Sequence, residues 1–132
     1  MKRVLLIEPL WIVSKLLEWK LKQQDFEVVS YRRLNQALEA LPHYQENNAP
    51  DIIIVDYFPT KAAGREIIEA ICKESAFALA LLIGLVQARE DSGYKPQHKR
   101  YVEVEKPFAV QHLFELVASY LEGMENDEGE QK

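Results

Sequence analysis

The chain has 132 residues, of which 48% are hydrophobic and 28% charged, and its formal net charge is −5. These values predict one globular domain with a substantial core. Residues 122–132 hold most of the net charge, so the rest is close to neutral and lacks the basic excess of a nucleic-acid-binding protein. The single cysteine, Cys72, excludes an intramolecular disulfide and a cysteine-based zinc site. There is no signal peptide or bilayer-spanning apolar run, so we expect a cytoplasmic protein that binds no membrane.

The first half of the chain alternates strand-like and helix-like patterns. Apolar or β-branched runs predict strands over residues 2–7 (KRVLLI), 27–31 (EVVSY) and 52–55 (IIIV). The first and third are apolar enough to be buried on both faces, whereas the second is weaker and belongs nearer an edge of the sheet. Helical spacing predicts helices over residues 10–22 and 34–44, the second interrupted by Pro42.

The helix predicted over residues 10–22 is apolar on more than one face. Its core-facing residues are Leu10, Val13, Leu17 and Leu21, and its polar residues are Ser14, Lys15, Glu18 and Lys22. Ile12, Leu16 and Trp19 widen the apolar arc beyond the usual core stripe. We expect these three side chains to pack against a neighbouring helix, with a partner-binding surface as the alternative.

The second half continues the alternation. We expect a helix over residues 65–75 with Ile67, Ile68, Ile71 and Cys72 inward, a central strand over 77–86, a strand over 101–104 and a last helix over 109–121. Residues 87–100 are polar and contain Gly93 and Pro96, so a helix there is short or absent. Residues 1–122 then form the domain, and the acidic residues 123–132, which have no periodicity, form a disordered tail.

Strands that alternate with helices through short connections predict an α/β fold. The five predicted strands form a doubly wound parallel sheet with right-handed crossovers and helices on both faces. In such a sheet the carboxyl ends of all strands meet at one edge, where ligand chemistry gathers.

Three predicted strands end in an ionisable residue. Glu8 follows the first strand, Asp56 the third and Lys106 the fifth, so we expect them to converge at the carboxyl edge. A carboxylate beside an ammonium group, with a second acid nearby, is suited to receiving a phosphoryl group. Asp56 and Lys106 could instead form a stabilising ion pair without any chemistry.

At these residues the chain resembles the receiver domain of two-component response regulators. The resemblance rests on VLLIE at 4–8, DIIIVD at 51–56 followed by Gly64, and EKPF at 105–108. It implies a five-stranded sheet in the order 2-1-3-4-5. It also implies that Asp56 is the phosphoacceptor and that Lys106, which precedes a proline, contacts the phosphoryl group. Metal ligands would be Glu8, Asp56 and the backbone carbonyl of Phe58.

The chain also departs from the receiver pattern. The second metal-binding acid is replaced by Pro9, which supplies no ligand side chain, so any Mg²⁺ site should be weak. Counting back from Lys106 puts the switch hydroxyl of the family at Gly84 or Leu85, so no switch hydroxyl is expected; residues 76–91 contain no serine or threonine. The switch aromatic expected three residues before Lys106 is Glu103, with Tyr101 two residues earlier on the same strand face.

These features predict an atypical receiver domain, not an enzyme, that acts mainly as a protein–protein interaction module with an incomplete phosphorylation switch. The alternative is a working phosphoacceptor that a histidine kinase phosphorylates on Asp56. Expected partners are a histidine kinase or a downstream effector, and family behaviour implies a homodimer through the last helix. His43, His98 and His112 show no metal-ligand spacing, and no motif supports a hydrolase, dinucleotide or ATP site; a flavin site rests on fold alone.

Overall fold

The computed structural model describes residues 2–56, 61–87, 96–106, 112–113, 115–120 and 122–123. Its centre is one parallel sheet of five strands in the order β2-β1-β3-β4-β5, which confirms the predicted fold class and strand order. The strands are β1 (Arg3–Ile7), β2 (Glu27–Tyr31), β3 (Ile52–Asp56), β4 (Leu81–Gln87) and β5 (Tyr101–Lys106). The weaker strand β2 lies at an edge, as its sequence predicted.

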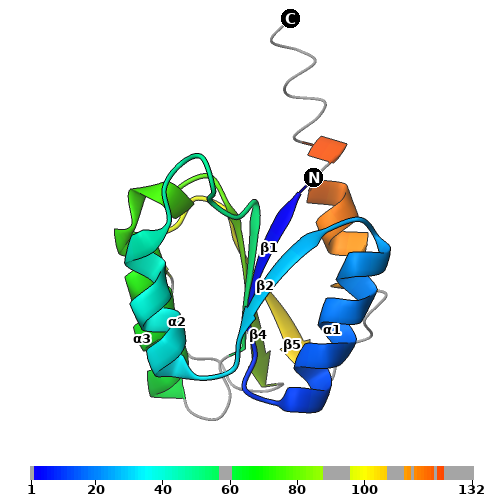
Figure 1. Ribbon diagram of the computed structural model, residues 1–132, viewed down its shortest axis with the longest axis horizontal. Coiled ribbons are helices and arrows are strands. Elements are labelled where there is room, and N and C mark those ends of the chain that lie inside the picture. The colour runs from blue at the N-terminus through cyan, green and yellow to red at the C-terminus, as the bar shows by residue number, and fades with distance from the viewer. Residues whose placement is uncertain are drawn as a thin grey trace, which may run out of the picture.

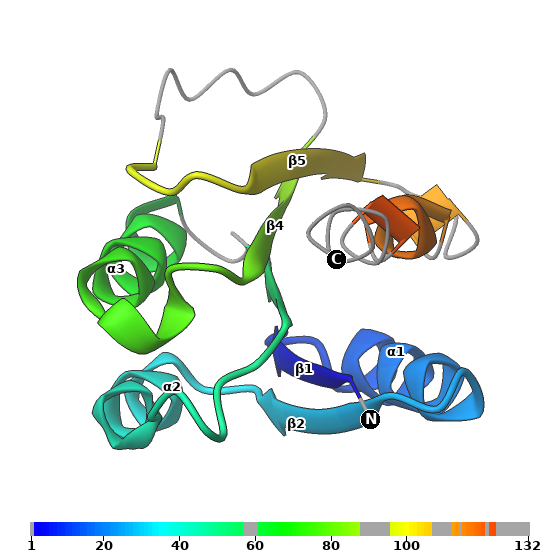
Figure 2. The ribbon, with the colours of Figure 1, turned by 90° about the horizontal axis from the view of Figure 1, so that it is seen from above.

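Helices cover both faces of this sheet (Figures 1 and 2). The helices are α1 (Trp11–Gln23), α2 (Leu34–Ala40) and α3 (Lys61–Lys73), with short 3-10 helices at Leu41–His43 and Ser75–Phe77. Residues 112–113, 115–120 and 122–123 are also helical and belong to the last helix, which lies on the same side as α1, opposite α2 and α3 (Figure 2). None of the helices in the described ranges is long and apolar enough to cross a bilayer.

The alternating side chains of the strands divide the core into two layers. Val4, Leu6, Ile52 and Ile54 pack under α1 and the last helix, whereas Leu5, Ile7, Ile53 and Val55 pack under α2 and α3. The side chains of β1, β3 and β4 are buried in both layers, because these strands lie between neighbouring strands and beneath helices on each side. The first and third predicted strands are therefore buried on both faces, as expected.

Two element boundaries differ from those predicted. Helix α3 begins at Lys61, and Gly64 lies inside it, because the strong helix formers Ala62 and Ala63 outweigh the glycine. Strand β4 begins at Leu81, and the preceding apolar residue Phe77 is buried at the end of a 3-10 helix, since an apolar run does not by itself define where a strand starts.

The region between β4 and β5 is described only in part. Residues 96–100 contain no helix, and residues 88–95, where the prediction of a short or missing helix mainly falls, lie outside the described residues. Of the tail predicted over residues 123–132, Gly123 is helical and residues 124–132 lie outside the described residues. In the last helix Leu113 and Val117 are buried, as their spacing predicted.

Helix α1 corrects three expectations. Leu10, predicted to face the core, is its N-cap residue and is 46% exposed. Ser14 is buried and not on the polar face, because it stands three residues before Leu17 and seven before Leu21 and so shares their face. Ile12, Leu16 and Trp19 do not pack against a neighbouring helix: they are 72%, 43% and 56% exposed. The helix is thus apolar on its inner face and on its outer face.

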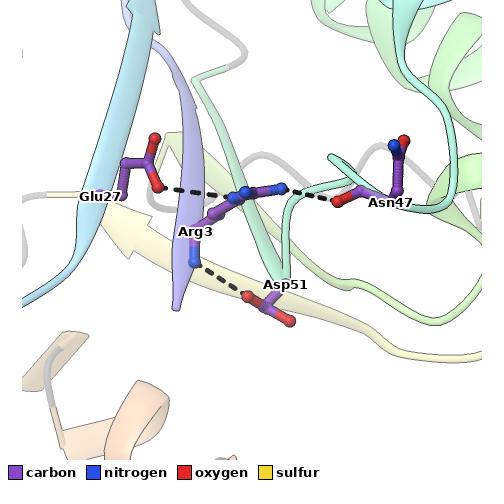
Figure 3. Close-up of polar contacts among 4 residues, drawn as sticks. All are labelled: Arg3, Glu27, Asn47 and Asp51. Atoms are coloured by element: carbon purple, nitrogen blue, oxygen red, sulfur yellow. Dashed lines mark hydrogen bonds and ion pairs between the residues drawn. The ribbon is translucent and has the colours of Figure 1, made fainter. Parts of the chain in front are cut away.

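The amino end of the sheet is held by a network around Arg3 (Figure 3). The backbone N–H of Arg3 donates to Asp51 Oδ2 at 2.8 Å, and its guanidinium donates to the carbonyl oxygen of Asn47 at 3.0 Å and to Glu27 Oε2 at 3.4 Å. These bonds join β1 to β2 and to the residues that lead into β3. Their role is structural, because every partner is satisfied within the fold.

Candidate functional site

The carboxyl edge of the sheet brings two acidic residues together. Ile7 pairs with Val55 across β1 and β3, so Glu8 and Asp56 stand at the same level, one position further along each strand. Glu8 is 0% exposed and Asp56 is 6% exposed. The alternation of β3, in which Ile52 and Ile54 face α1, puts Asp56 on the α1 face of the sheet. The predicted convergence of these two residues therefore holds.

Backbone bonds fix Glu8 at the corner between β1 and α1. Its N–H donates to the carbonyl oxygen of Tyr31 at 3.1 Å, which extends the β1–β2 pairing, and its Oε1 accepts the N–H of Leu10 at 3.1 Å. Leu10 is the N-cap residue of α1 and makes no side-chain cap of its own. Glu8 therefore orients the start of α1, a role that requires no metal and no phosphoryl group.

The ends of β4 and β5 complete this edge. Lys106 is the last residue of β5 and pairs in register with Gln87, the last residue of β4. Gly84 and Leu85, where the count from Lys106 put the switch position, lie inside the strand, and Leu85 is a buried core residue opposite Asp56. Both positions thus lie in the strand beside the end of β3, and neither carries a hydroxyl. The strand-end position is Gln87, which carries an amide.

Other predicted site residues are only partly described. The structure describes the backbone of Lys106 but not its side chain, and Phe58 lies outside the described residues. Glu103 is exposed and accepts a hydrogen bond from the hydroxyl of Tyr101 at 3.1 Å. Tyr101 also packs against the core layer under α2 and α3. Tyr101 and Glu103 thus share a strand face, as expected, and that face is opposite the one that Asp56 occupies.

The described residues fit a magnesium ion poorly. Mg²⁺ requires near-octahedral oxygen coordination, and usually takes one or two carboxylates with water or phosphate oxygens. Here Oε1 of Glu8 already accepts a backbone N–H, and Pro9 offers no side-chain oxygen. Within the described ranges no group of three or more histidine, cysteine, aspartate or glutamate side chains is placed to hold a metal ion.

A polar cleft adjoins this edge beside α1. It has a volume of about 430 Å³ and is lined by Ser14, Lys15, Glu18, Ser30, Tyr31, Arg32, Arg33 and Gln36. Glu18 accepts the hydroxyl of Ser30 at 2.8 Å and pairs with Lys15 at 3.3 Å. Burial alone would raise the pKa of Glu18, but the Ser30 hydrogen bond and Lys15 outweigh it and lower that pKa below its usual value. Sequence reasoning missed this cleft, although the pair Arg32-Arg33 directly after a strand could have signalled it.

The histidines and the cysteine do not contribute to the carboxyl edge. Nε2 of His98 lies 2.7 Å from the carbonyl oxygen of Ala80, directly before β4. Cys72 is half-buried in α3 and packs against the core layer under that helix, and burial, with a smaller effect of Glu69, raises the pKa of its thiol. A raised pKa makes this thiol a poor nucleophile at neutral pH.

Comparison with known proteins identifies similar folds but no close relative. No family model matches the chain, and no curated protein matches it. Among solved structures, the chemotaxis protein CheY4 of Vibrio cholerae is 20% identical with a TM-score of 0.71, covering 90% of this chain and 98% of that one. A response regulator receiver modulated diguanylate cyclase from Pelobacter carbinolicus is 19% identical with a TM-score of 0.72, covering 97% and 98%.

A third match has the same architecture in another kind of protein. The receiver domain of the hybrid histidine kinase CckA is 20% identical with a TM-score of 0.66, covering 89% of this chain and 96% of that one. The identities are too low to carry a function across, but the strand order, the helix layers and the coverage agree throughout. The chain therefore has the fold of the response regulator receiver domains.

Proposed function

We propose that this protein is an atypical receiver domain that acts in two-component signal transduction mainly as a protein–protein interaction module. The observation that carries the proposal is the composition of the carboxyl edge. A receiver fold presents Asp56 and Glu8 there, but Pro9 stands in the place of the second metal-binding acid, and neither Gly84 nor Leu85, where the resemblance puts the switch hydroxyl, carries one.

The local contacts of Glu8 support an incomplete switch. In a phosphorylation switch the acids beside the acceptor must bind a cation that offsets the charge of the phosphoryl group. Glu8 instead gives one oxygen to the N–H of Leu10 and is fully buried. A Glu8 that shapes the start of α1 explains its retention without a working metal site.

The second candidate is a functional phosphoacceptor, and the burial of Asp56 at a strand end favours it. An oxygen of the Asp56 carboxylate would attack the phosphorus of a phosphohistidine, and the phosphorus–nitrogen bond would break. The imidazole nitrogen would leave with the electron pair and take up a proton. Lys106 would contact the phosphoryl oxygens. Under either candidate the domain signals through a protein partner, a histidine kinase or an effector, and is not itself an enzyme.

Intact-mass measurement distinguishes the two candidates. The protein is incubated with Mg²⁺ and a small acyl phosphate, with Asp56→Asn as the matched control. The interaction-module proposal predicts the unmodified mass for both proteins. An acid-labile gain of one phosphoryl group on the parent protein, absent from Asp56→Asn, would establish the phosphoacceptor instead.

A further inference from the structure

The outer face of α1 carries an apolar stripe that none of the residues described by the structure covers. Ile12, Leu16 and Trp19 follow one another at spacings of four and three residues and are 72%, 43% and 56% exposed. This spacing aligns them along one side of a helix, over about 10 Å of its length. Trp11, at the start of the same helix, is also more than half exposed. Large apolar side chains gathered in this way mark an interaction surface.

Basic side chains border the stripe on both sides. On a helical projection Lys15 and Lys22 flank it on one side and Lys20 on the other, with Lys20 Nζ 5.1 Å from the centroid of the Trp19 ring. Arg32 and Arg33 line the adjoining cleft, and neither makes an ion pair or a side-chain hydrogen bond within the described residues.

The acids near this surface are largely neutralised. Glu18 is paired with Lys15 and its side chain is only 14% exposed. Glu27 is paired with Arg3 at the other end of the sheet. Helix α1 itself therefore carries a net positive charge, with Lys15, Lys20 and Lys22 against Glu18, although the protein as a whole carries a formal charge of −5.

We propose that this surface docks an acidic amphipathic helix of a partner protein. The stripe has the i, i+4, i+7 spacing with which helices pack against one another, and its basic border complements acidic residues that flank an apolar stripe on the partner. The proposal deepens the proposed function, on which it rests, because it specifies the surface and the class of partner. It locates docking on α1.

Other occupants fit the surface less well. A second copy would bring lysines against lysines, since α1 exposes no acid to pair with them. An anionic bilayer would attract the lysines but repel the net negative protein as a whole. The acidic residues 124–132 contain one apolar side chain, Met124, too few to cover three apolar positions.

The test uses three stapled helical peptides that share one leucine stripe and contain no tryptophan. The residues beside the stripe are glutamate in the first peptide, glutamine in the second and lysine in the third. Both tryptophans of the protein lie on α1 and are exposed, so their emission reports binding directly. We expect the glutamate peptide to bind at least about tenfold more tightly than the lysine peptide, to shift the emission to the blue and to weaken with added salt.

Variants and competing ligands complete the design. The double variant Ile12→Ser/Leu16→Ser keeps both tryptophans and the buried face of α1 and should lose binding, whereas Leu79→Ser, which changes an equally exposed residue (71%) elsewhere, should keep it. Vesicles of phosphatidylglycerol and sedimentation of the protein alone test a membrane and a second copy.

Each outcome decides the proposal. Absent binding, equal affinity for the glutamate and lysine peptides, or binding kept in the double variant would overturn it. So would tighter binding to the vesicles than to the glutamate peptide, or self-association that the double variant abolishes. If peptide binding holds but an acyl phosphate changes its affinity through Asp56, the docking surface stands and the incomplete switch fails.

Discussion

The stretch DIIIVD begins and ends with aspartate, and its two carboxylates lie in opposite environments. Asp51, at the amino end of the sheet, accepts the N–H of Arg3 within a network that joins three segments (Figure 3). Asp56, at the carboxyl end, is buried beside Glu8. The same side chain therefore has a structural role at one end of the strand and a place suited to chemistry at the other. The two roles differ because the two aspartates lie at opposite ends of one strand, and in a parallel sheet ligands bind at the carboxyl ends of the strands.

The largest loss of stability should come from a substitution in the buried centre of β3, the strand that joins Asp51 to Asp56. Ile53→Ala removes a fully buried side chain from the layer under α2 and α3 and should lower the free energy of unfolding by about 2–5 kcal/mol. The matched change Ile12→Ala removes an exposed side chain and should cost less than about 0.5 kcal/mol. Urea denaturation measures both. Equal costs would contradict the assignment of the two isoleucines to core and surface.

The comparison of the two aspartates can be tested directly. Asp51→Ala leaves the partly buried N–H of Arg3 without its acceptor and should cost about 1–2 kcal/mol, whereas Asp51→Asn keeps an oxygen and should cost less. Asp56→Asn removes a negative charge from beside Glu8 and should not lower the free energy of unfolding. Urea denaturation measures all three variants. A larger loss of unfolding free energy for Asp56→Asn than for Asp51→Ala would contradict these two roles.

A single substitution should strengthen metal binding at the carboxyl end. Pro9→Asp supplies the second acid beside Glu8 and Asp56, and should tighten Mg²⁺ binding by at least about tenfold. Trp11, two residues after position 9, makes tryptophan fluorescence a suitable readout. We expect no saturable response of the parent protein at low Mg²⁺ concentration. A parent affinity equal to that of Pro9→Asp would show that the proline does not weaken the site.

The smallest effect concerns a third carboxylate, Glu18, in the cleft beside α1. Because folding lowers its pKa, its stabilising contribution is full above the usual value of 4.5 and is lost as the pH falls through the lowered value. Ser30→Ala removes the hydrogen bond to Glu18 and should cost about 0.5–1 kcal/mol at neutral pH. This cost should shrink in acid, as measured by thermal unfolding against pH. A cost of Ser30→Ala that does not change with pH would contradict this role of Glu18. Ser119→Ala, which changes an exposed serine, serves as the control.

The sequence was sufficient to predict the strands, their parallel arrangement and the convergence of Glu8 and Asp56. These follow from apolar runs and from the rule that parallel strands end at one edge, while the strand order came from the family resemblance. The switch position at Gly84 or Leu85 stays a prediction, because the count from Lys106 spans residues 88–95, which lie outside the described residues.

The two faces of α1 show why the rest could not be predicted. Periodicity reveals that Leu17 and Leu16 lie on different apolar arcs, but not which arc the sheet covers. That depends on how the helix is rotated when it packs, which is set by contacts distant in sequence. The buried Ser14 marks the inner face, and the exposed Ile12 marks the outer one.

The central claim is that the phosphorylation switch at Asp56 is incomplete, so that a phosphoryl mimic at Asp56 does not change the rest of the fold. Amide spectra of the ¹⁵N-labelled protein, recorded with Mg²⁺ and with or without beryllium fluoride as the phosphoryl mimic, test it most directly, with Asp56→Asn as the control. We predict that any shifts stay next to Asp56 and leave β5 and residues 112–120 unchanged. Shifts that spread through Tyr101, Val104 and the last helix in the parent protein, and not in Asp56→Asn, would contradict the account.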